Sequence, residues 1–435
     1  MKLLKQKTLW GLLLMVAFVL LLAACAPERE GAEETTGNGE EADGTEGTEE
    51  SEEADKPEEL VVWINDEDIA EDVSTEMFDR YTEETGIEIS YRRVAMPDQV
   101  EELALAGPTG DGPDLFFQPQ DRLGDVIAQG LALPINYTEE EMNGFTDVAI
   151  DAFTYDGDVY GAPVAVETYF AFYNKDIIES APETIDEVLE MSKEVTDASN
   201  DQYGFLVSPE FYYLYSFMNA YGGYVFGEED GVYDPSDIGL DNEGAIEGLT
   251  KYQEFLNEGL IPKTLTVDVL DGLFTEGKVG MVFSGPWNMP IYKEALGDSV
   301  ATAPLPAMNG ETAPSFIGVK SWLVSYYSDH PEWAEDLAKF MTNDENSQVY
   351  YDVTGELPPR PEILDAVDDP MYAGYTEQVP HGTPMPNIPQ MAQVWDMDVA
   401  IELINNNADV EEALTDTVQN IKDNMDVSGG LSADE

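Results

Sequence analysis

Short apolar runs alternate with segments of helical periodicity in the first part of this chain, and few folds accommodate such a pattern. Strand-forming runs occupy residues 60–65, 87–94 and 115–117, and apolar side chains at helical spacing occupy residues 69–84 and 99–105. β-Branched and aromatic residues favour strands, whereas apolar side chains three and four residues apart favour an amphipathic helix. Strands separated by helices are typical of α/β domains with a parallel sheet. The sequence therefore predicts an α/β fold.

Polar side chains follow the ends of these predicted strands. Asn65 and Glu67 come after the first run, and Asp121 and Arg122 come after the third. Because ligands bind outside the carboxyl ends of strands in such sheets, we expect these side chains to face one crevice. Arginine is scarce in this chain, and its guanidinium can bind a carboxylate or two neighbouring hydroxyls. The alternative is a surface Asp–Arg pair that contributes little to stability.

Residues 162–176 (APVAVETYFAFYNKD) form a strand-like stretch that contains one acid between its ends, Glu167. Its β-branched and aromatic residues predict a largely buried strand, entered from Pro163, which cannot donate a ladder hydrogen bond. The carboxylate has two interpretations. It is either a solvated acid at a bend between two strands, or a side chain that faces a cleft where the strand crosses between two lobes.

A second α/β region follows this stretch. It contains predicted helices at residues 185–195 and 242–257, an aromatic segment at 210–215, and a strand at 279–283 that leads to Trp287. The glycine and lysine spacing just before that strand is similar to a phosphate-binding loop. The order of strand, loop and helix is reversed, however, and the hydroxyl residue that binds magnesium is missing, so we interpret this segment as a helix end.

The last third of the chain continues the alternation. It contains a predicted strand at residues 316–326, which we interpret as a return to the first lobe, and a helix at 331–342. The proline-rich residues 358–361 cannot be helical and are predicted to be extended. A further helix is predicted at residues 391–405, with Trp395 one turn after its start.

The charge of the chain excludes whole classes of partner. There are 19 Lys and Arg residues against 90 Asp and Glu residues, a formal net charge of -71. Such a charge repels nucleic acids and anionic lipid surfaces, so we exclude nucleic-acid binding. With so many acids, paired carboxylates occur by chance and are weak signals of glycosidase or metal chemistry. Scarce residue types such as tryptophan, arginine and histidine are therefore the informative ones.

We expect the melting temperature of this protein to rise with salt, and we predict that it works in saline or alkaline surroundings. Repulsion between surface carboxylates destabilises the compact state, and it is strongest at low salt because the Debye length there is about 30 Å, against about 3 Å at 1 M. Thermal unfolding over a sodium chloride series measures the effect. A melting temperature that is unchanged or higher without salt would contradict the prediction.

The first 25 residues have the pattern of an export signal. Lys2, Lys5 and Lys7 precede a long apolar stretch that ends in Leu-Ala-Ala-Cys at Cys25. This ending resembles the bacterial lipobox, whose cysteine is lipidated and becomes the mature first residue. Cys25 is the only cysteine, so no intramolecular disulfide forms. We predict a lipoprotein anchored at the extracellular face of the membrane. The acidic segment after Cys25 has almost no large apolar residues and is predicted to be a disordered tether.

Sequence motifs for catalysis are missing. The two histidines, His330 and His381, lie in no HExxH motif, and the chain has no Gly-x-Ser-x-Gly motif. No complete EF-hand loop is present, although acid clusters can bind cations weakly. We therefore predict no enzymatic activity, no cofactor and no dedicated metal site.

Several short segments together resemble the maltose/maltodextrin-binding proteins, the extracellular receptors of ATP-driven sugar importers. The resemblance covers about residues 60–426. The matching segments are VVWIN (61–65), TGDGPDLFF (109–117) with Asp-Arg (121–122), APVAVE (162–167), YNKD (173–176), GGY (222–224), SGPW (284–287) and MPNIPQM (385–391) with Trp395. MPNIPQM with the downstream tryptophan is highly specific, whereas GDGPD alone is shared with many solute-binding proteins.

The resemblance implies a two-lobe periplasmic-binding-protein-like fold. Each lobe is expected to be a mainly parallel sheet flanked by helices, and hinge strands join the lobes and allow them to close. The predicted parts of the chain are a signal peptide (1–24), an acidic disordered tether (25–57), lobe 1 (58–165 plus 315–357), lobe 2 (166–314 plus 358–426) and a disordered tail (427–435).

The resemblance also implies a ligand and its contacts. The expected ligand is maltose, a maltodextrin or a related glucan, and the expected partners of this monomeric receptor are the membrane subunits of an ABC importer. Side chains expected to hydrogen-bond sugar hydroxyls are Asn65, Glu67, Asp121, Arg122, Glu167 and Glu210; those expected to stack on sugar rings are Tyr212, Trp287 and Trp395, with Met385 lining the cleft. Carboxylates and guanidinium groups fit paired hydroxyls, and aromatic faces cover the C–H face of glucose. The alternative for each ring is core packing.

Two positions depart from the pattern of that family. Gln118 stands where the family has a tryptophan, and Asp68 stands where it has a lysine. One stacking surface and one cationic donor are therefore missing, which leaves longer, branched or cyclic glucans open as ligands. From a different functional class, the alternative is a secreted glycan-active enzyme or a surface lectin.

Overall fold

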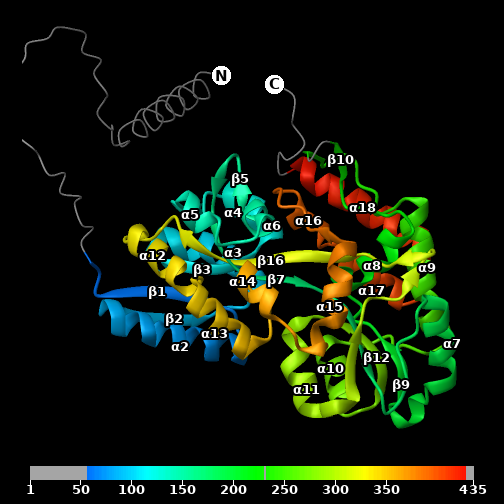
Figure 1. Cartoon of the computed structure of the whole chain (residues 1–435). Helices are drawn as coiled ribbons and strands as arrows, with labels where there is room; N and C mark the ends of the chain where they lie inside the picture. Colours follow the sequence, from blue (N-terminus) through cyan, green and yellow to red (C-terminus); the bar gives the residue numbers. More distant parts are fainter. Residues whose placement is uncertain (1–55, 230–231, 428–435) are drawn as a thin grey trace, which may run out of the picture. The chain divides into compact units, whose positions relative to one another are not determined.

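The computed structural model describes residues 56–229 and 232–427 (Figure 1). The predicted signal peptide, the lipidation site at Cys25 and the tail after residue 427 lie outside the described residues, as does the predicted tether up to residue 55. The described elements surround two main sheets, and three two-stranded ribbons lie outside these sheets. The ribbons pair β5 (Thr154–Tyr155) with β6 (Asp158–Val159), β10 (Gly227–Glu229) with β11 (Val232–Asp234), and β14 (Ala307–Met308) with β15 (Glu311–Thr312).

The first sheet has seven strands of mixed direction. They are β1 (Glu59–Ile64), β2 (Glu88–Arg93), β3 (Leu115–Pro119), β4 (Ala132–Leu133), β7 (Gly161–Thr168), β16 (Ser315–Ser325) and β17 (Gly382–Pro384). Their order is β17-β16-β3-β1-β2, and β4 and β7 also pair with β16. β1 runs parallel to β2 and β3, as the alternation of strands and helices predicts. β16 runs antiparallel to β3, β4 and β7.

The second sheet has four strands: β8 (Phe170–Asn174), β9 (Tyr203–Leu206), β12 (Val279–Ser284) and β13 (Val300–Ala303). Their order is β13-β8-β12-β9. β12 is parallel to β9, but β8 is antiparallel to both β12 and β13. The α/β class is therefore confirmed. The expectation that each lobe contains a mainly parallel sheet is wrong for the second sheet. The reason lies in long-range pairing, because β8 is placed between β12 and β13 and runs opposite to both.

The stretch at residues 162–176 is two strands rather than one. β7 pairs with β16 in the first sheet as far as Thr168, and β8 pairs with β12 in the second sheet from Phe170 onward. The Thr168 hydroxyl donates to the carbonyl of Phe316 at 2.7 Å, which ties the end of β7 to β16. Of the two interpretations of this stretch, the crossing between sheets is therefore the one observed, with Tyr169 between β7 and β8.

Helices cover both faces of the first sheet. α2 and α12 pack against one face, and α3, α4 and α6 pack against the other. The helices of this part are α2 (Asp68–Thr85), α3 (Gln99–Ala106), α4 (Leu123–Ala128), α5 (Glu139–Met142), α6 (Asp147–Ala152), α12 (Pro331–Met341) and α13 (Asp344–Thr354). α2 ends at Gly86, whose φ of 73° suits a residue without a side chain.

One large apolar cluster holds the second sheet and its helices. The remaining helices are α7 (Ile185–Val195), α8 (Phe211–Ala220), α9 (Glu243–Asn257), α10 (Val267–Thr275), α11 (Met289–Leu296), α14 (Pro361–Ala366), α15 (Ala373–Gln378), α16 (Met391–Val394), α17 (Met397–Asn405) and α18 (Val410–Val427). The helix predicted at residues 391–405 is thus divided at Trp395 and Asp396. No helix within the described residues is long and apolar enough to cross a bilayer.

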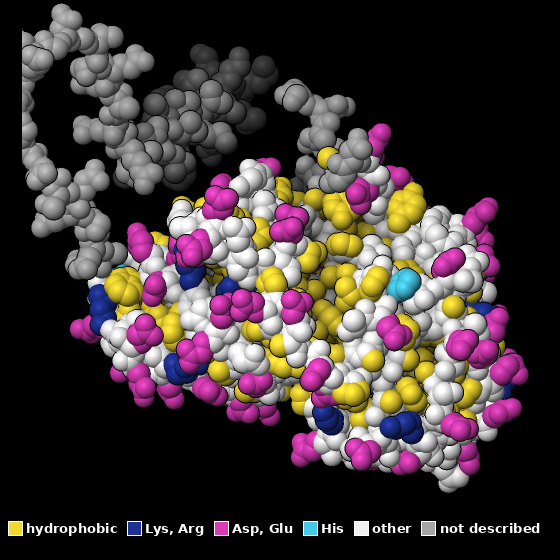
Figure 2. Space-filling model, viewed as in Figure 1, with side chains coloured by type: hydrophobic (Ala, Val, Ile, Leu, Met, Phe, Trp, Pro, Cys, Tyr) yellow, Lys and Arg dark blue, Asp and Glu magenta, His cyan; other side chains and the backbone are white. Residues whose placement is uncertain are grey.

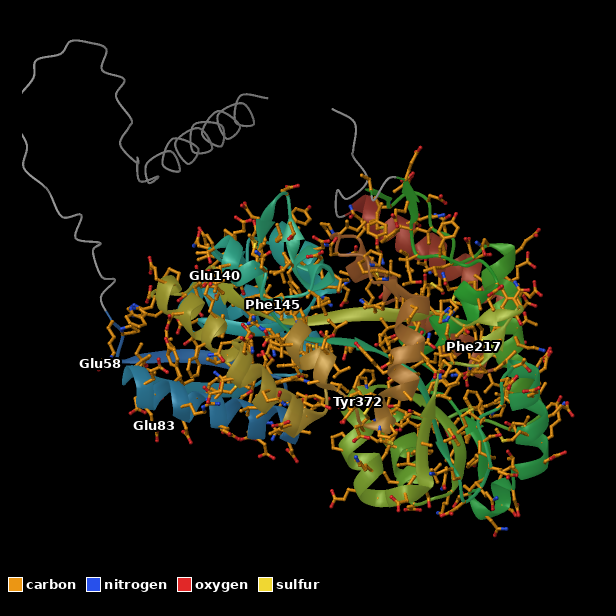
Figure 3. All side chains as sticks on the ribbon, viewed as in Figure 1. Glu58, Glu83, Glu140, Phe145, Phe217 and Tyr372 are labelled. Atoms are coloured by element: carbon orange, nitrogen blue, oxygen red, sulfur yellow. The ribbon has the colours of Figure 1, made fainter. Side chains whose placement is uncertain are left out.

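Acidic side chains spread over the surface, and apolar side chains fill the interior. Figure 2 shows Asp and Glu scattered across the whole visible face with few Lys or Arg between them. Glu58, Glu83 and Glu140 point outward, whereas Phe217 and Tyr372 lie among the helices and strands (Figure 3). The negative charge is therefore carried mainly by solvated groups, which favours stabilisation by salt as the sequence predicts.

Candidate functional site

A cavity of about 440 Å³ lies between elements of the two sheets. Nine of the ten predicted ligand-binding side chains line this cavity, and the tenth, Glu210, does not. The lining residues are Asn65, Glu67, Met96, Pro97, Gln118, Pro119, Asp121, Arg122, Glu167, Tyr212, Trp287, Lys320, Met385, Trp395 and Asp398. Residues far apart in the sequence therefore meet at one place, and we call this cavity the inter-sheet cavity.

Loops after parallel strands supply one wall of the inter-sheet cavity. Asn65 directly follows β1, and its side-chain oxygen accepts a hydrogen bond from the backbone N–H of Met96 at 2.9 Å. Glu67 precedes α2, and Asp121 and Arg122 lie in the single 3₁₀ turn after β3. This is the crevice that strand-end reasoning predicts. Arg122 is paired with Asp125 at 3.1 Å, rather than with its neighbour Asp121.

Aromatic side chains attached to the second sheet supply the opposite wall. Tyr212 lies in the first turn of α8, Trp287 lies in the 3₁₀ turn after β12, and Trp395 separates α16 from α17. The Tyr212 and Trp287 rings are 6.4 Å apart and inclined at 50°. The Tyr212 hydroxyl is buried without a hydrogen-bond partner among the described residues. Such a group can receive a polar ligand at little cost.

Asp121 and Trp395 join the two walls. The indole Nε1–H of Trp395 donates to Oδ2 of Asp121 at 3.0 Å. Burial raises the pKa of Asp121 above its ordinary value, and the charge of Arg122 and the Trp395 hydrogen bond oppose that rise. The hydrogen bond ties the Trp395 side chain of the second wall to the loop after β3 in the first.

Glu167 belongs to a buried chain of charged groups. The Nζ atom of Lys320 lies 2.7 Å from Oε2 of Glu167 and 2.9 Å from Oε1 of Glu356. The hydroxyl of Tyr350 donates to the other oxygen of Glu356 at 2.8 Å. Burial raises the pKa of Glu167, and the charge of Lys320 lowers it. Burial alone would lower the pKa of Lys320, but the charges of Glu167 and Glu356 raise it.

Glu210 is not among the residues that line the inter-sheet cavity. It is the residue before α8, and its side chain makes no capping hydrogen bond. Burial and the nearby charge of Asp398 raise the pKa of Glu210. Asp398 lines the cavity instead and accepts a hydrogen bond from the backbone N–H of Phe211 at 2.6 Å. The position of Glu210 therefore does not support its predicted contact.

Gln118 and Asp68, the two positions that depart from the family pattern, lie in different environments. Gln118 is fully buried, and its Nε2 donates to the carbonyl of Met96 at 2.8 Å, so it occupies the wall without offering an aromatic face. The Asp68 side chain is 95% exposed and pairs with Arg93. No cation comes from that loop, and the cations that line the cavity are Arg122 and Lys320.

Lys320 and Asp398 were not predicted as site residues. Lys320 could have been noticed, because a base within the apolar run 316–326 is unusual in a chain so poor in bases. Asp398 gave no signal, since acids are abundant and it lies in a helix. Within the described residues, no group of three or more His, Cys, Asp or Glu side chains is arranged to hold a metal ion.

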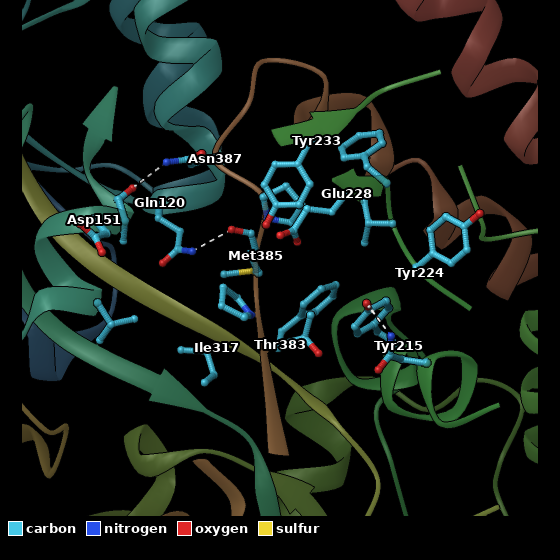
Figure 4. A pocket seen from close by; sticks show the side chains of 18 of the residues that line it. Gln120, Asp151, Tyr215, Tyr224, Glu228, Tyr233, Ile317, Thr383, Met385 and Asn387 are labelled. Atoms are coloured by element: carbon cyan, nitrogen blue, oxygen red, sulfur yellow. Dashed lines mark hydrogen bonds between the residues drawn. The ribbon is translucent and has the colours of Figure 1, made fainter. Parts of the chain in front are cut away.

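A second cavity, of about 920 Å³, lies beside the first and shares the lining residue Met385 with it (Figure 4). Gln120 donates to the Met385 carbonyl at 2.8 Å, next to Asp121 of the inter-sheet cavity. Asp151, Glu228 and Tyr233 also face this space, and no lysine or arginine lines it. The absence of a cationic donor and of any tryptophan distinguishes its lining from that of the inter-sheet cavity.

Comparison with known proteins matches this architecture. Residues 76–379 match the family described as bacterial extracellular solute-binding protein. The chain is 34% identical to a galactooligosaccharide-binding protein of Bacillus subtilis (strain 168), over 94% of this chain and 95% of that protein. It is 33% identical to a maltodextrin-binding protein of the same strain, over 80% and 85%. It is 28% identical to a maltooligosaccharide ABC transporter solute-binding lipoprotein of Streptococcus pneumoniae R6, over 79% and 84%.

A solved structure extends the match to three dimensions. The crystal structure of a cyclo/maltodextrin-binding protein complexed with maltotetraose has a TM-score of 0.73 to this chain and 38% sequence identity, covering 85% of this chain and 98% of that one. The matched family and the two-lobe architecture agree, and this family binds solutes rather than converting them. This chain therefore belongs to the bacterial extracellular solute-binding proteins.

Proposed function

We propose that this protein is the extracellular receptor of an ABC importer and binds maltose or maltodextrins in the inter-sheet cavity. The observation that supports this most directly is the meeting of aromatic faces with carboxylates and a guanidinium in one cavity between two sheets. Sugar rings present C–H faces to aromatic side chains and hydroxyl pairs to planar charged groups. Relatives named for maltodextrin and for an ABC transporter of maltooligosaccharides support the same ligand and partner.

The proposed contacts follow the two walls. Asn65, Glu67, Asp121, Arg122 and Glu167 would hydrogen-bond sugar hydroxyls. The faces of Tyr212, Trp287 and Trp395 would stack on glucose rings, with Met385 beside them. The predicted sugar contact of Glu210 stays a prediction, because its side chain is not among those that line the cavity.

We propose two lobes, each built mainly around one of the two main sheets, although β7 stays in the first sheet as far as Thr168 and β17 of lobe 2 also pairs in that sheet. Lobe 1 is residues 58–165 with 315–357, and lobe 2 is residues 166–314 with 358–426. Each would move as a unit when the cavity closes on sugar. The passage of the chain from β7 in one sheet to β8 in the other supports a hinge close to the first boundary.

We propose that the receptor is a monomer held to the membrane by a lipid on Cys25, with the acidic residues after Cys25 as the tether; the predicted bounds of the tether (25–57) and tail (427–435) are each too wide, because Pro57 is buried and Val427 still belongs to α18. The signal-like residues 1–24 and the Leu-Ala-Ala-Cys ending support this, as does a relative named as a lipoprotein. The surface charge supports a receptor adapted to saline surroundings.

Titration with sugars tests the function. We expect maltotriose to change tryptophan fluorescence saturably and to be recovered intact, whereas hydrolysis products would favour the glycan-active enzyme. Titrations with maltose and with cyclodextrin show which chain length and which shape of glucan the protein binds. A galactooligosaccharide serves as the competing ligand, because one relative bears that name. Binding of the galactooligosaccharide without any binding of maltotriose would contradict the proposed ligand.

A further inference from the structure

Lys320 is a buried base in the wall of the inter-sheet cavity. Its side chain, on β16, is only 12% exposed. Its ammonium lies between Glu167 and Glu356, and it also lies 5.6 Å from the centre of the Trp287 ring. Lys320 therefore connects β16 and β7 of the first sheet to an aromatic side chain attached to the second.

Strand register explains why Lys320 meets Glu167. Lys320 pairs with Ala165 and Gly318 pairs with Glu167, so Lys320 and Glu167 are diagonal neighbours on one face of the β7–β16 ladder. Gly318 provides the space. A Cβ atom there would lie 2.8 Å from Cε of Met385 and 3.4 Å from Cγ of Glu167. The absence of a side chain at this position lets the acid, the base and Met385 share one wall.

The ammonium of Lys320 has one more donor than its two carboxylates need. A lysine ammonium carries three N–H groups and no acceptor. Glu167 and Glu356 account for two of them, and within the described residues no hydrogen-bond acceptor is recorded for the third. Because Lys320 lines the inter-sheet cavity, that donor is available to a ligand.

We propose that Lys320 is a specificity-determining residue of the sugar site, which fixes Glu167 as an ionised acceptor and donates its third N–H to a glucose hydroxyl. This rests on the proposed function. An ion pair buried only for stability would not need to line the cavity. The loop after β1 supplies no cation, because Asp68 faces solvent, so Lys320 and Arg122 are the positive groups that offset the acids of this site.

The charges around Lys320 predict how the pH dependence of sugar binding would change in a variant that lacks this side chain. Glu167 and Glu356 contact it directly, Tyr350 holds Glu356, and Glu67 adds a further negative charge nearby. Burial raises the pKa of Glu167, and Lys320 is the group that opposes this most strongly. Without Lys320 the pKa of Glu167 rises further, so the carboxylate takes up a proton at a higher pH. A neutral carboxyl is a weaker acceptor, and sugar affinity should then increase with pH.

Lys320→Met, which keeps length and removes charge, tests the proposal by maltotriose titration from about pH 6 to about pH 9. We expect the maltotriose affinity to be at least roughly tenfold weaker, because one hydrogen bond to a charged group is lost. We also expect this affinity to increase with pH. The parent, which keeps Lys320, should show a smaller increase with pH than Lys320→Met. Lys320→Arg keeps the charge and should restore the parent's profile.

Lys339→Met is the matched control, since Lys339 also contacts two carboxylates, Glu141 and Glu335, but does not line the inter-sheet cavity. It should bind maltotriose as the parent does. Failure of the parent to bind would refute the proposed function. If the parent binds and Lys320→Met, shown to be folded by its melting curve, stays within about twofold at every pH, the role of Lys320 is refuted. If Lys320→Met does not fold, a Lys320→Arg variant that binds like the parent but shows a steeper increase with pH would refute it too.

Discussion

We expect Trp287→Ala and Trp395→Ala each to weaken maltotriose binding by about 2 kcal/mol or more, roughly 30-fold in Kd. Each ring forms part of the wall of the inter-sheet cavity and is partly buried, so its removal takes away apolar surface that a sugar ring would cover. The loss has two sources for Trp395, because its removal also leaves Asp121 without its indole donor. Isothermal titration calorimetry measures the affinities, since fluorescence is altered by the substitutions themselves.

Trp333→Ala is the control for these two variants. Trp333 lies on α12 and packs against the first sheet, outside the lining of the inter-sheet cavity. Its replacement should change the melting temperature without changing maltotriose affinity. Affinities of Trp287→Ala and Trp395→Ala that both remain within about 1 kcal/mol of the parent would show that these rings do not stack on sugar.

We expect Phe316→Ala to lower the free energy of unfolding by about 3–5 kcal/mol, the usual loss for a fully buried phenylalanine. The Phe316 ring is stacked on Tyr215 with centroids 3.8 Å apart and planes within 2°, and it also faces Tyr212 at 6.1 Å. Because Tyr212 loses its supporting ring, maltotriose affinity should fall as well. Urea unfolding in high salt gives the stability, and calorimetry gives the affinity.

Phe255→Ala separates the two effects of Phe316→Ala. Phe255 is fully buried on α9, where its ring contacts Phe205 in the second sheet at 5.5 Å, and it does not line the inter-sheet cavity. We expect a comparable loss of stability with unchanged affinity. Equal affinity losses in the two variants would mean that the site responds to stability in general and not to support of Tyr212.

Local sequence patterns predicted the elements well where one force dominates. The helix at 185–195 has the predicted bounds, because its apolar face is regular and Thr184 caps it by accepting from the N–H of Glu187. The segment similar to a phosphate loop is a helix end, as predicted: Gly277 has a φ of 72° between α10 and β12. The rule that ligands bind outside the carboxyl ends of strands also predicted that Asn65 and Asp121 face one crevice, and both line the inter-sheet cavity.

The sequence could not predict features that depend on long-range pairing. The change of sheet at Tyr169 follows from which strands β7 and β8 meet, and nothing within residues 162–176 interrupts the strand pattern. The direction of β8 in its sheet depends on the same partners. Glu210 does not line the cavity, whereas Asp398, an acid from a helix nearly 190 residues later, lines it and accepts from the N-terminus of α8. One acid among 90 could not be singled out for this contact.

Tyr169, the residue between β7 and β8, links the wall of the inter-sheet cavity to the connection between the two sheets. Its ring packs against Tyr212 with centroids 5.0 Å apart and against Tyr213 at 5.3 Å. Tyr212 belongs to the wall of the inter-sheet cavity, so a ligand that displaces its ring would push on the inter-sheet connection through a single van der Waals contact. Because Tyr169 itself belongs to the apolar cluster of the second sheet, a displaced Tyr212 ring would act on the backbone torsions of the connection through one ring of that cluster.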